Sequence, residues 1–295
     1  MWPFFEIGET YVTIGDQFSL RLSTRSLILS TNTTSMTNTA LRWSGIIWFC
    51  CAAIGQVLFA AFIIDFYGAR TAYGDFAGWN ERGVITGYVA GDTIGNLVFI
   101  SHVLLAIIVA LGGIFQLVPA IRRRYPAAHR WNGRVFILVS VILAVGGLWA
   151  VWVRGSYLSV ISGLSVSLNG VLILIFCALA YRRAVERNFV AHEVWAIRAF
   201  LVVSGVWFFR VFVMAWITAW QGPVGMTEDL TGPADVGLSL ASYLVPLIVY
   251  ELYREAKRSA SKPLKIGAIS TMGLATLVTA GGIAGATLFM WFPGG

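Results

Sequence analysis

The stretch from His192 to Trp220 decides the fold, and its sequence is HEVWAIRAFLVVSGVWFFRVFVMAWITAW. It is long enough to cross a bilayer as a helix, because about 20 residues span the hydrocarbon core. The same stretch nevertheless holds Arg198 and Arg210 within apolar sequence. An arginine in hydrocarbon is costly unless it finds water or a partner, so an ionisable group there is a hypothesis for a functional site.

The composition of the whole chain is that of a protein embedded in a lipid bilayer. Of its 295 residues, 58% are hydrophobic and only 12% are charged, which excludes an ordinary soluble domain. The net charge of +7 comes mostly from short loops between apolar segments, where basic residues set membrane orientation. We therefore expect the bilayer as a partner and no nucleic acid. The three cysteines lie inside apolar segments and indicate neither disulfides nor a metal knuckle.

Apolar segments of membrane-spanning length make up most of the chain after residue 41. They lack the period-two alternation of barrel strands, so the sequence predicts an all-α integral membrane bundle over 42–295 with about seven transmembrane helices. The preceding residues, 1–41, are polar and rich in Thr and Ser, which predicts a flexible tail; a start at Met36 is the alternative. The predicted segments are 43–64, 97–119, 132–153, 157–181, 194–219, 236–253 and 266–292.

The loops predict the orientation of this bundle. The second, fourth and sixth connections carry thirteen Lys and Arg residues, whereas the connections on the other side carry three. The positive-inside rule therefore places the N-terminus inside and the C-terminus outside. The seventh segment contains GLATLVTAGGIAGA, whose small residues suit close packing against another helix of this chain or of another protein.

Residues 97–219 contain a pattern that indicates a duplicated helical hairpin. In each half a basic pair precedes Ala-His, a tryptophan, an arginine and an aromatic residue. A true repeat would make His129 and His192 counterparts at the inner membrane edge. Positive-inside bias combined with interfacial tryptophans could produce the same pattern. The matched residues are Ala128, His129, Trp131, Arg134 and Phe136 in the first half, and Ala191, His192, Trp195, Arg198 and Phe200 in the second.

Polar residues within the apolar segments suggest two sites. On one straight helix His192 and Arg210 are 18 positions apart, about five turns, and so share a face. The predicted outer-half site consists of His102, Arg210 and Asn169, and the predicted inner-edge site of His129, His192 and nearby arginines, including Arg134.

Each of these residues also has a purely structural interpretation. The inner histidines could be solvated or bound to lipid headgroups, and His102 could hydrogen-bond a backbone carbonyl. Arg210 could extend toward the outer surface, and Arg198 is close enough to the inner surface to reach it.

The segments HVLLAIIVALGGIFQL, HRWNGRVF and HEVWAIRAF, together with Arg210, resemble a bacterial family of polytopic membrane proteins, domain of unknown function 2306, over residues 95–220. This resemblance implies a multi-pass protein of the bacterial inner membrane. A looser similarity is to small b-type cytochromes, whose transmembrane helices supply histidine pairs. Only His129 and His192 match in depth, which makes them the candidate ligands of a haem iron; no other metal site is expected.

Three functions follow as alternatives. The first is a membrane redox protein in which His129 and His192 hold a b-type haem, or His102 and Arg210 bind a quinone carbonyl. The second is an accessory or assembly subunit that docks to a larger membrane complex through the seventh segment and the N-terminal tail. The third is a proton-linked or small-molecule transporter, which the shortage of intramembrane carboxylates disfavours. No hydrolytic or phosphate-transfer motif is present, and whether the protein is an enzyme stays open.

Overall fold

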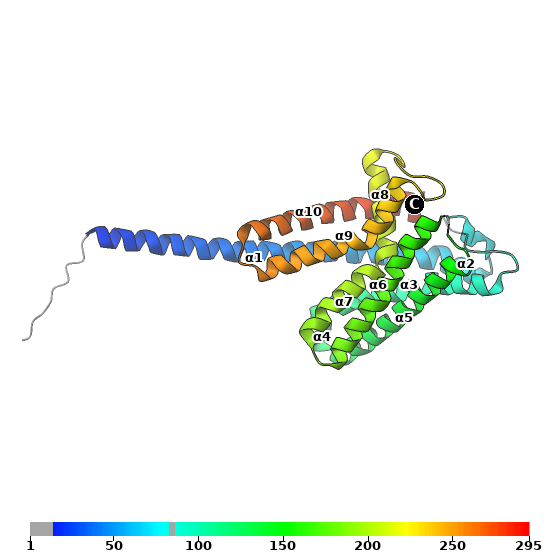
Figure 1. Cartoon of the computed structure of the whole chain (residues 1–295), viewed down its shortest axis with the longest axis horizontal. Coiled ribbons are helices and arrows are strands. Elements are labelled where there is room, and N and C mark those ends of the chain that lie inside the picture. Colours follow the sequence, from blue (N-terminus) through cyan, green and yellow to red (C-terminus); the bar gives the residue numbers. More distant parts are fainter. Residues whose placement is uncertain (1–13, 83–85, 158, 295) are drawn as a thin grey trace, which may run out of the picture.

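The computed structural model describes residues 14–82, 86–157 and 159–294, with side chains from Met36 onward (Figure 1). Every regular element within these ranges is a helix, which confirms the predicted all-α class. The helices are α1 (Ile14–Phe62), α2 (Ala69–Tyr73), α3 (Thr93–Leu117), α4 (Pro119–Arg124), α5 (Pro126–Trp152), α6 (Val160–Val185), α7 (Phe189–Val203), α8 (Gly205–Trp220), α9 (Pro233–Arg258) and α10 (Lys262–Gly285), with the π-helical turns η1 (Ile63–Gly68) and η3 (Ala286–Trp291) and the 3-10 turn η2 (Ala77–Asn80).

The number of membrane-spanning helices agrees with the prediction. Among the described residues six helices are long and apolar enough to cross a membrane, and α7 with α8 makes a seventh if the pair counts as one span. The first span is longer than the predicted 43–64, because the helix continues through η1 and α2 to Tyr73. The charged Asp65 interrupts the apolar sequence there but does not end the helix.

The stretch from His192 to Trp220 is not a single straight helix. α7 ends at Val203, α8 begins at Gly205, and the two are bent by 55°. The prediction that His192 and Arg210 lie on one face of a continuous helix is therefore wrong. The local sequence permits this bend, since sharp kinks occur at Ser and Gly neighbours and Ser204 precedes Gly205 here.

The bend moves the chain from one group of helices to another (Figure 1). α7 packs mainly on α6 and also contacts α9, whereas α8 packs mainly on α10 and also contacts α9, and α1 lies along α10. Small residues make the α8–α10 contact close, because a Cβ added at Gly282 would lie 2.1 Å from the Val211 carbonyl oxygen. The predicted close packing of the seventh segment is thus confirmed within this chain.

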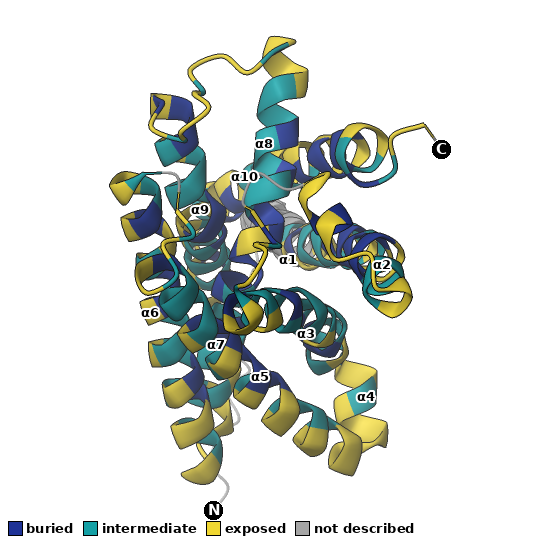
Figure 2. Cartoon of the chain, turned by 90° about the vertical axis from the view of Figure 1, so that its right-hand side faces the viewer, coloured by how far each residue is buried: buried dark blue, intermediate teal, exposed yellow. Residues whose placement is uncertain are grey.

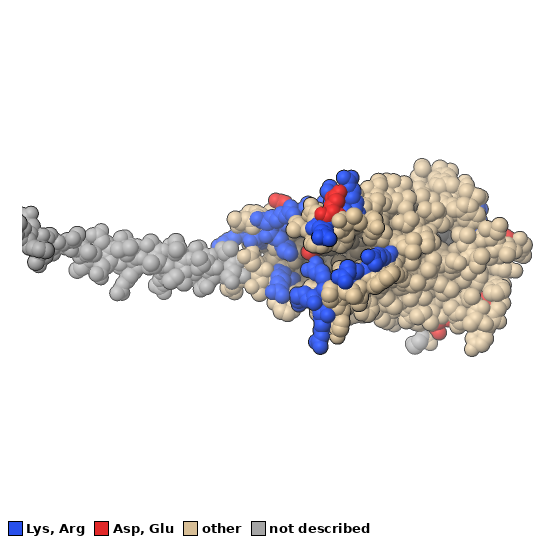
Figure 3. Space-filling view, turned by 90° about the horizontal axis from the view of Figure 1, so that it is seen from below, with Lys and Arg blue, Asp and Glu red and all other residues tan. Residues whose placement is uncertain are grey.

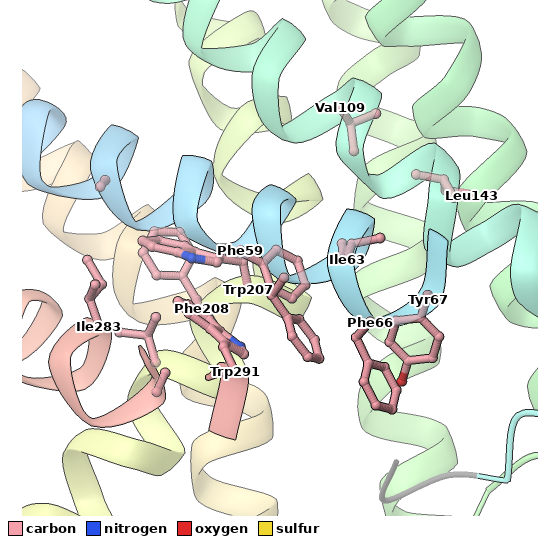
Figure 4. Packing of buried hydrophobic residues seen from close by; sticks show 14 of the residues in the cluster. Phe59, Ile63, Phe66, Tyr67, Val109, Leu143, Trp207, Phe208, Ile283 and Trp291 are labelled. Carbon is pink, nitrogen blue, oxygen red and sulfur yellow. The ribbon is translucent and has the colours of Figure 1, made fainter. Parts of the chain in front are cut away.

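An aromatic cluster fills the space where α1, α8 and η3 meet (Figure 4). The rings of Phe59 and Trp291, for example, have centroids 5.5 Å apart. In a bilayer such packing stabilises mainly through close van der Waals contact, since lipid tails are as apolar as the side chains themselves. The cluster includes Phe59, Phe62, Phe66, Trp207, Phe208 and Trp291.

The outer surface of the bundle is that of a membrane protein. Buried residues gather where helices face one another, and exposed residues cover the outer faces (Figure 2). Many exposed side chains are large and apolar, including Leu277 with 72% and Phe289 with 69% of their surface exposed. Such faces are suited to contact lipid.

Basic side chains gather at one end of the bundle (Figure 3). That end holds the connections after α4, α6 and α9, from which the orientation was predicted. The orientation itself stays a prediction. Of the predicted tail, residues 14–41 belong to α1 and residues 1–13 lie outside the described residues, so its flexibility also stays a prediction. The hairpins α3–α5 and α6–α7 occupy the predicted repeat, but duplication is not tested by their presence.

Candidate functional site

Arg210 of α8 is a charged side chain within the broken span that α7 and α8 form. Its guanidinium lies over the Phe59 ring of α1, with the Cζ atom 5.4 Å from the ring centroid, and its Nη1 donates to the Val206 carbonyl at 3.2 Å. No carboxylate of the described residues pairs with it. Its charge instead acts on Tyr67 of η1 and on His102 of α3. We call these three side chains and Phe59 the Arg210 site.

His102 reaches the Arg210 site from the opposite group of helices. Its Cε1 atom lies 3.4 Å from the position that a Cβ would take at Gly147, which places the ring against α5. The sequence therefore pairs His102 with Arg210 correctly as neighbours in space. The third predicted member, Asn169, lies elsewhere.

Asn169 of α6 faces the bend between α7 and α8. Its Nδ2 atom is 2.6 Å from the position of a Cβ at Gly205, and the adjacent Ser204 accepts a 3.0 Å hydrogen bond from Gln56 Nε2 of α1. Arg210 is five residues after Gly205, which places it about 7.5 Å further along the axis of α8. Asn169 therefore contacts the start of α8, whereas Arg210 lies farther along that helix, and the two residues do not form one site.

The inner-edge histidines lie near each other, as their matched depth predicts. His192 lies close enough to His129 to act on it electrostatically, and Arg122 adds to the positive surroundings of His129. His192 Nδ1 lies 2.9 Å from the Ala180 carbonyl oxygen, which can only accept, so Nδ1 is the donor of this hydrogen bond. Arg134 does not join this site, because it is exposed and lies over the Trp131 ring at 5.0 Å.

A cavity of about 260 Å³ adjoins His129. Gln116 of α3 donates from Nε2 to the His129 carbonyl at 3.1 Å, while Gln116 Oε1 and His129 Nδ1 are buried without a hydrogen-bond partner among the described residues. Polar atoms thus line an otherwise apolar space. The lining residues are Phe115, Gln116, Ile121, Ala128, His129 and Asn132.

Arg198 of α7 differs from Arg210 in having a partner. Its Nε and Nη2 atoms donate to Glu251 Oε1 of α9 at 2.8 and 2.7 Å. The other oxygen of Glu251 accepts from Arg254 at 2.9 Å. The interpretation that Arg198 needs only to reach the inner surface misses this ion pair between α7 and α9.

Sequence reasoning missed several other residues of these places. Tyr67 lies beyond the predicted segment 43–64, because the apolar run ends at Asp65. Gln56 lies within that segment, where apolar length alone does not distinguish it from its neighbours. Gln56 did carry a signal, since it is a lone amide within apolar sequence. Ser204 carried one too, as half of the Ser-Gly pair where α7 ends.

At the end of the bundle where α3 begins and α5 ends, Arg154 connects three segments. Its Nε donates to Asp92 at 2.7 Å, and its Nη2 donates to the Gly87 carbonyl and to Asn96 Oδ1 at 3.1 and 3.0 Å. This hydrogen bond from Arg154, together with the Gly95 backbone N–H, holds the pKa of Asp92 below its ordinary value. Asp92 also caps α3, as its sequence position suggests.

A family model described as Predicted membrane protein (DUF2306) matches residues 99–253. The chain belongs to the DUF2306 family. The match runs from α3 into α9, and so includes the Arg210 site on α3 and α8 and both inner-edge histidines. α1 and α10 lie outside the DUF2306 match, so Gln56, Phe59 and Tyr67 reach these places from flanking sequence. No curated protein and no solved structure matches the chain.

These findings describe a multi-pass membrane protein of the DUF2306 family. The resemblance to that family is confirmed. The similarity to b-type cytochromes and the bacterial inner membrane as location stay predictions.

Proposed function

We propose that this DUF2306 protein is a membrane redox protein that binds a quinone at the Arg210 site. The observation that carries the proposal is the contrast between two arginines of one broken span. Arg198 is neutralised by Glu251, whereas no described carboxylate pairs with Arg210. A guanidinium held at membrane depth without a carboxylate is suited to an acceptor oxygen of a ligand.

The surroundings of Arg210 favour a quinone over other acceptors. The His102 ring and the Tyr67 hydroxyl add donors near the guanidinium, which suits a carbonyl oxygen. Phe59 and the aromatic cluster beside it suit the face of a flat ring (Figure 4). The long apolar tail of a membrane quinone would remain in the lipid. The same donors would orient the head group, while its electrons would come from a membrane electron carrier.

The test compares quinone binding by two matched variants. Short-chain quinone is titrated into the purified protein in nanodiscs, and quenching of tryptophan fluorescence reports binding, since Trp207 lies one turn from Arg210. Arg210→Leu should lose binding by tenfold or more, because one charge-assisted hydrogen bond contributes about 1.5–3 kcal/mol. Arg198→Leu, on the preceding helix, should bind like the wild type.

Two outcomes would contradict the proposal: no saturable quenching by the wild-type protein, or a larger loss in Arg198→Leu than in Arg210→Leu. Arg210→Lys serves as the control for charge. It should retain part of the binding, because lysine keeps the positive charge but loses the planar fork of donors.

A b-type haem between His129 and His192 is the second candidate. It is favoured by the hydrogen bond from His192 Nδ1 to the Ala180 carbonyl, which is the arrangement that orients metal-ligating histidines. Arg122 and Arg130 near His129 would suit haem propionates. The adjoining cavity of about 260 Å³ is, however, below the usual range of about 300–1,000 Å³ for ligand sites. A haem would therefore require these helices to separate.

The ultraviolet-visible spectrum of protein purified after haem-replete expression tests the haem candidate. A Soret band that disappears in both His129→Ala and His192→Ala would support it. Absence of the band in the wild type would refute it. The accessory-subunit and transporter hypotheses stay predictions, which no described contact favours over quinone binding.

A further inference from the structure

The bend between α7 and α8 gathers polar side chains in the interior of the bundle. Gln56 comes from α1, Asn169 from α6, Ser204 from the bend itself and Trp207 from the first turn of α8. Their exposed fractions are 1%, 8%, 8% and 3%, so all four are more than nine-tenths buried. Most of their neighbours are apolar. Burying polar side chains among them costs free energy of folding unless their hydrogen bonds are satisfied.

Protein groups satisfy only part of this hydrogen-bonding capacity. Gln56 Nε2 donates to Ser204 Oγ at 3.0 Å. Gln56 Oε1, Asn169 Oδ1 and Trp207 Nε1 are buried and find no hydrogen-bond partner in the described part of the chain. Turning over either amide would exchange its oxygen for its nitrogen and still leave one polar atom without a protein partner.

The side chains that carry the unpartnered atoms come from residues around the α7–α8 bend. Asn169 Nδ2 lies 2.6 Å from the position of a Cβ at Gly205. Trp207 is three residues from Ser204, and its Cζ2 atom lies 2.7 Å from the position of a Cβ at Gly55, the residue before Gln56. The backbone of Ser204 itself is paired, because its N–H donates to the Phe200 carbonyl at 3.0 Å and its carbonyl accepts from the Phe208 N–H at 2.9 Å.

The chemistry and the space at the bend decide which ligand fits. Two of the unpartnered atoms are acceptors and one is a donor, so the ligand must both donate and accept hydrogen bonds. A cation would face the positive Arg210, which follows on α8, with no carboxylate among these side chains. A larger organic ligand is disfavoured, because Gly55 and Gly205 bring the helices within contact distance.

We propose that the α7–α8 bend holds buried water, bound by Gln56, Asn169 and Trp207. Water donates to both amide oxygens and accepts from the indole N–H, and buried waters ordinarily make two to four such bonds. The proposal does not depend on quinone binding.

Hydroxyl-radical labelling by synchrotron radiolysis, read by mass spectrometry, tests the proposal on the full-length protein in detergent. Radicals formed from a bound water oxidise the side chain beside it even when that side chain is buried. Trp207 should therefore be labelled faster than Trp291, which is 0% exposed and packs among aromatic rings. The Nε1 atom of Trp291 is likewise buried without a described hydrogen-bond partner, so the comparison asks whether the two amides at the bend, rather than an indole N–H alone, hold the water. In the double variant Gln56→Leu, Asn169→Leu the labelling of Trp207 should fall to the level of Trp291.

Two results would overturn the proposal: equal labelling of the two tryptophans in the wild type, or unchanged Trp207 labelling in the double variant. The wild-type comparison needs no variant and so survives a failure of the double variant to fold. The single variant Asn169→Leu provides a milder change and should reduce Trp207 labelling part of the way. Labelling of Trp220, which is 58% exposed on the same helix, monitors whether the radical dose is constant.

Discussion

Gly282→Ala tests the close contact that joins α8 to α10. A Cβ at this position would lie 2.1 Å from the Val211 carbonyl oxygen and 2.7 Å from its Cγ1 atom, where ordinary contact needs 3.4–4 Å. The carbonyl belongs to a helix backbone and cannot rotate away, so the two helices must separate by roughly 1 Å. Overpacking of this kind costs about 1–3 kcal/mol, and we expect the upper half of that range.

The adjacent residue provides the control for this substitution. Gly281 lies on the same helix, and a Cβ there meets nothing within 4 Å. Gly281→Ala should leave stability unchanged or raise it by about 0.5–1 kcal/mol, because alanine loses less backbone entropy than glycine. Equilibrium unfolding by SDS titration in mixed micelles measures both variants. Equal stability of the two, or a larger loss in Gly281→Ala, would refute the packing described for α8 and α10.

Three further predictions concern stability. Glu251→Gln should destabilise the protein by about 1–3 kcal/mol in the same titration, because its ion pairs with Arg198 and Arg254 are partly buried and so lie between the buried and exposed cases. Glu193→Gln is the control: its ion pair with Arg122 is exposed, so it should cost at most about 1 kcal/mol. The lowered pKa of Asp92 means that its contribution is present above its ordinary pKa of about 3.9 and is lost as pH falls through the lower folded value; Asp92→Asn should flatten the acid limb of a plot of Tm against pH. Gly205→Ala should lower the Tm through its clash with Asn169, and adding Asn169→Ser should restore part of the loss; no restoration would place Asn169 away from the bend.

Much of this fold follows from apolar length and charge placement alone. The spans after the first are recovered because each helix is apolar enough to be recognised without its neighbours. The neighbourhood of His129 and His192 was also predictable, since both begin helices at the same membrane edge. Tyr67 could not be predicted as part of the first span, because the apolar sequence ends near Asp65 while the helix continues beyond it.

The bend and the ion pairs depend on contacts between distant segments. A Ser-Gly pair permits a kink, but the 55° angle arises because α7 packs on α6 while α8 packs on α10. Arg198 and Glu251 are 53 residues apart, and no local pattern joins them. Without that pairing, the sequence could rank Arg210 above Arg198 only by depth, whereas the structure adds the difference in partners.

The bend at Ser204 also has a mechanical consequence, because a change in the bend angle would rotate α8 about Ser204 relative to α7. α8 has 16 residues and is about 24 Å long, so a change of about 10° in the bend would carry its far end by about 4 Å. Arg210, near the pivot, would move by only about 1.5 Å. A ligand held at Arg210 would thus experience a small displacement, while the C-terminal end of α8 and the loop that follows it would move further.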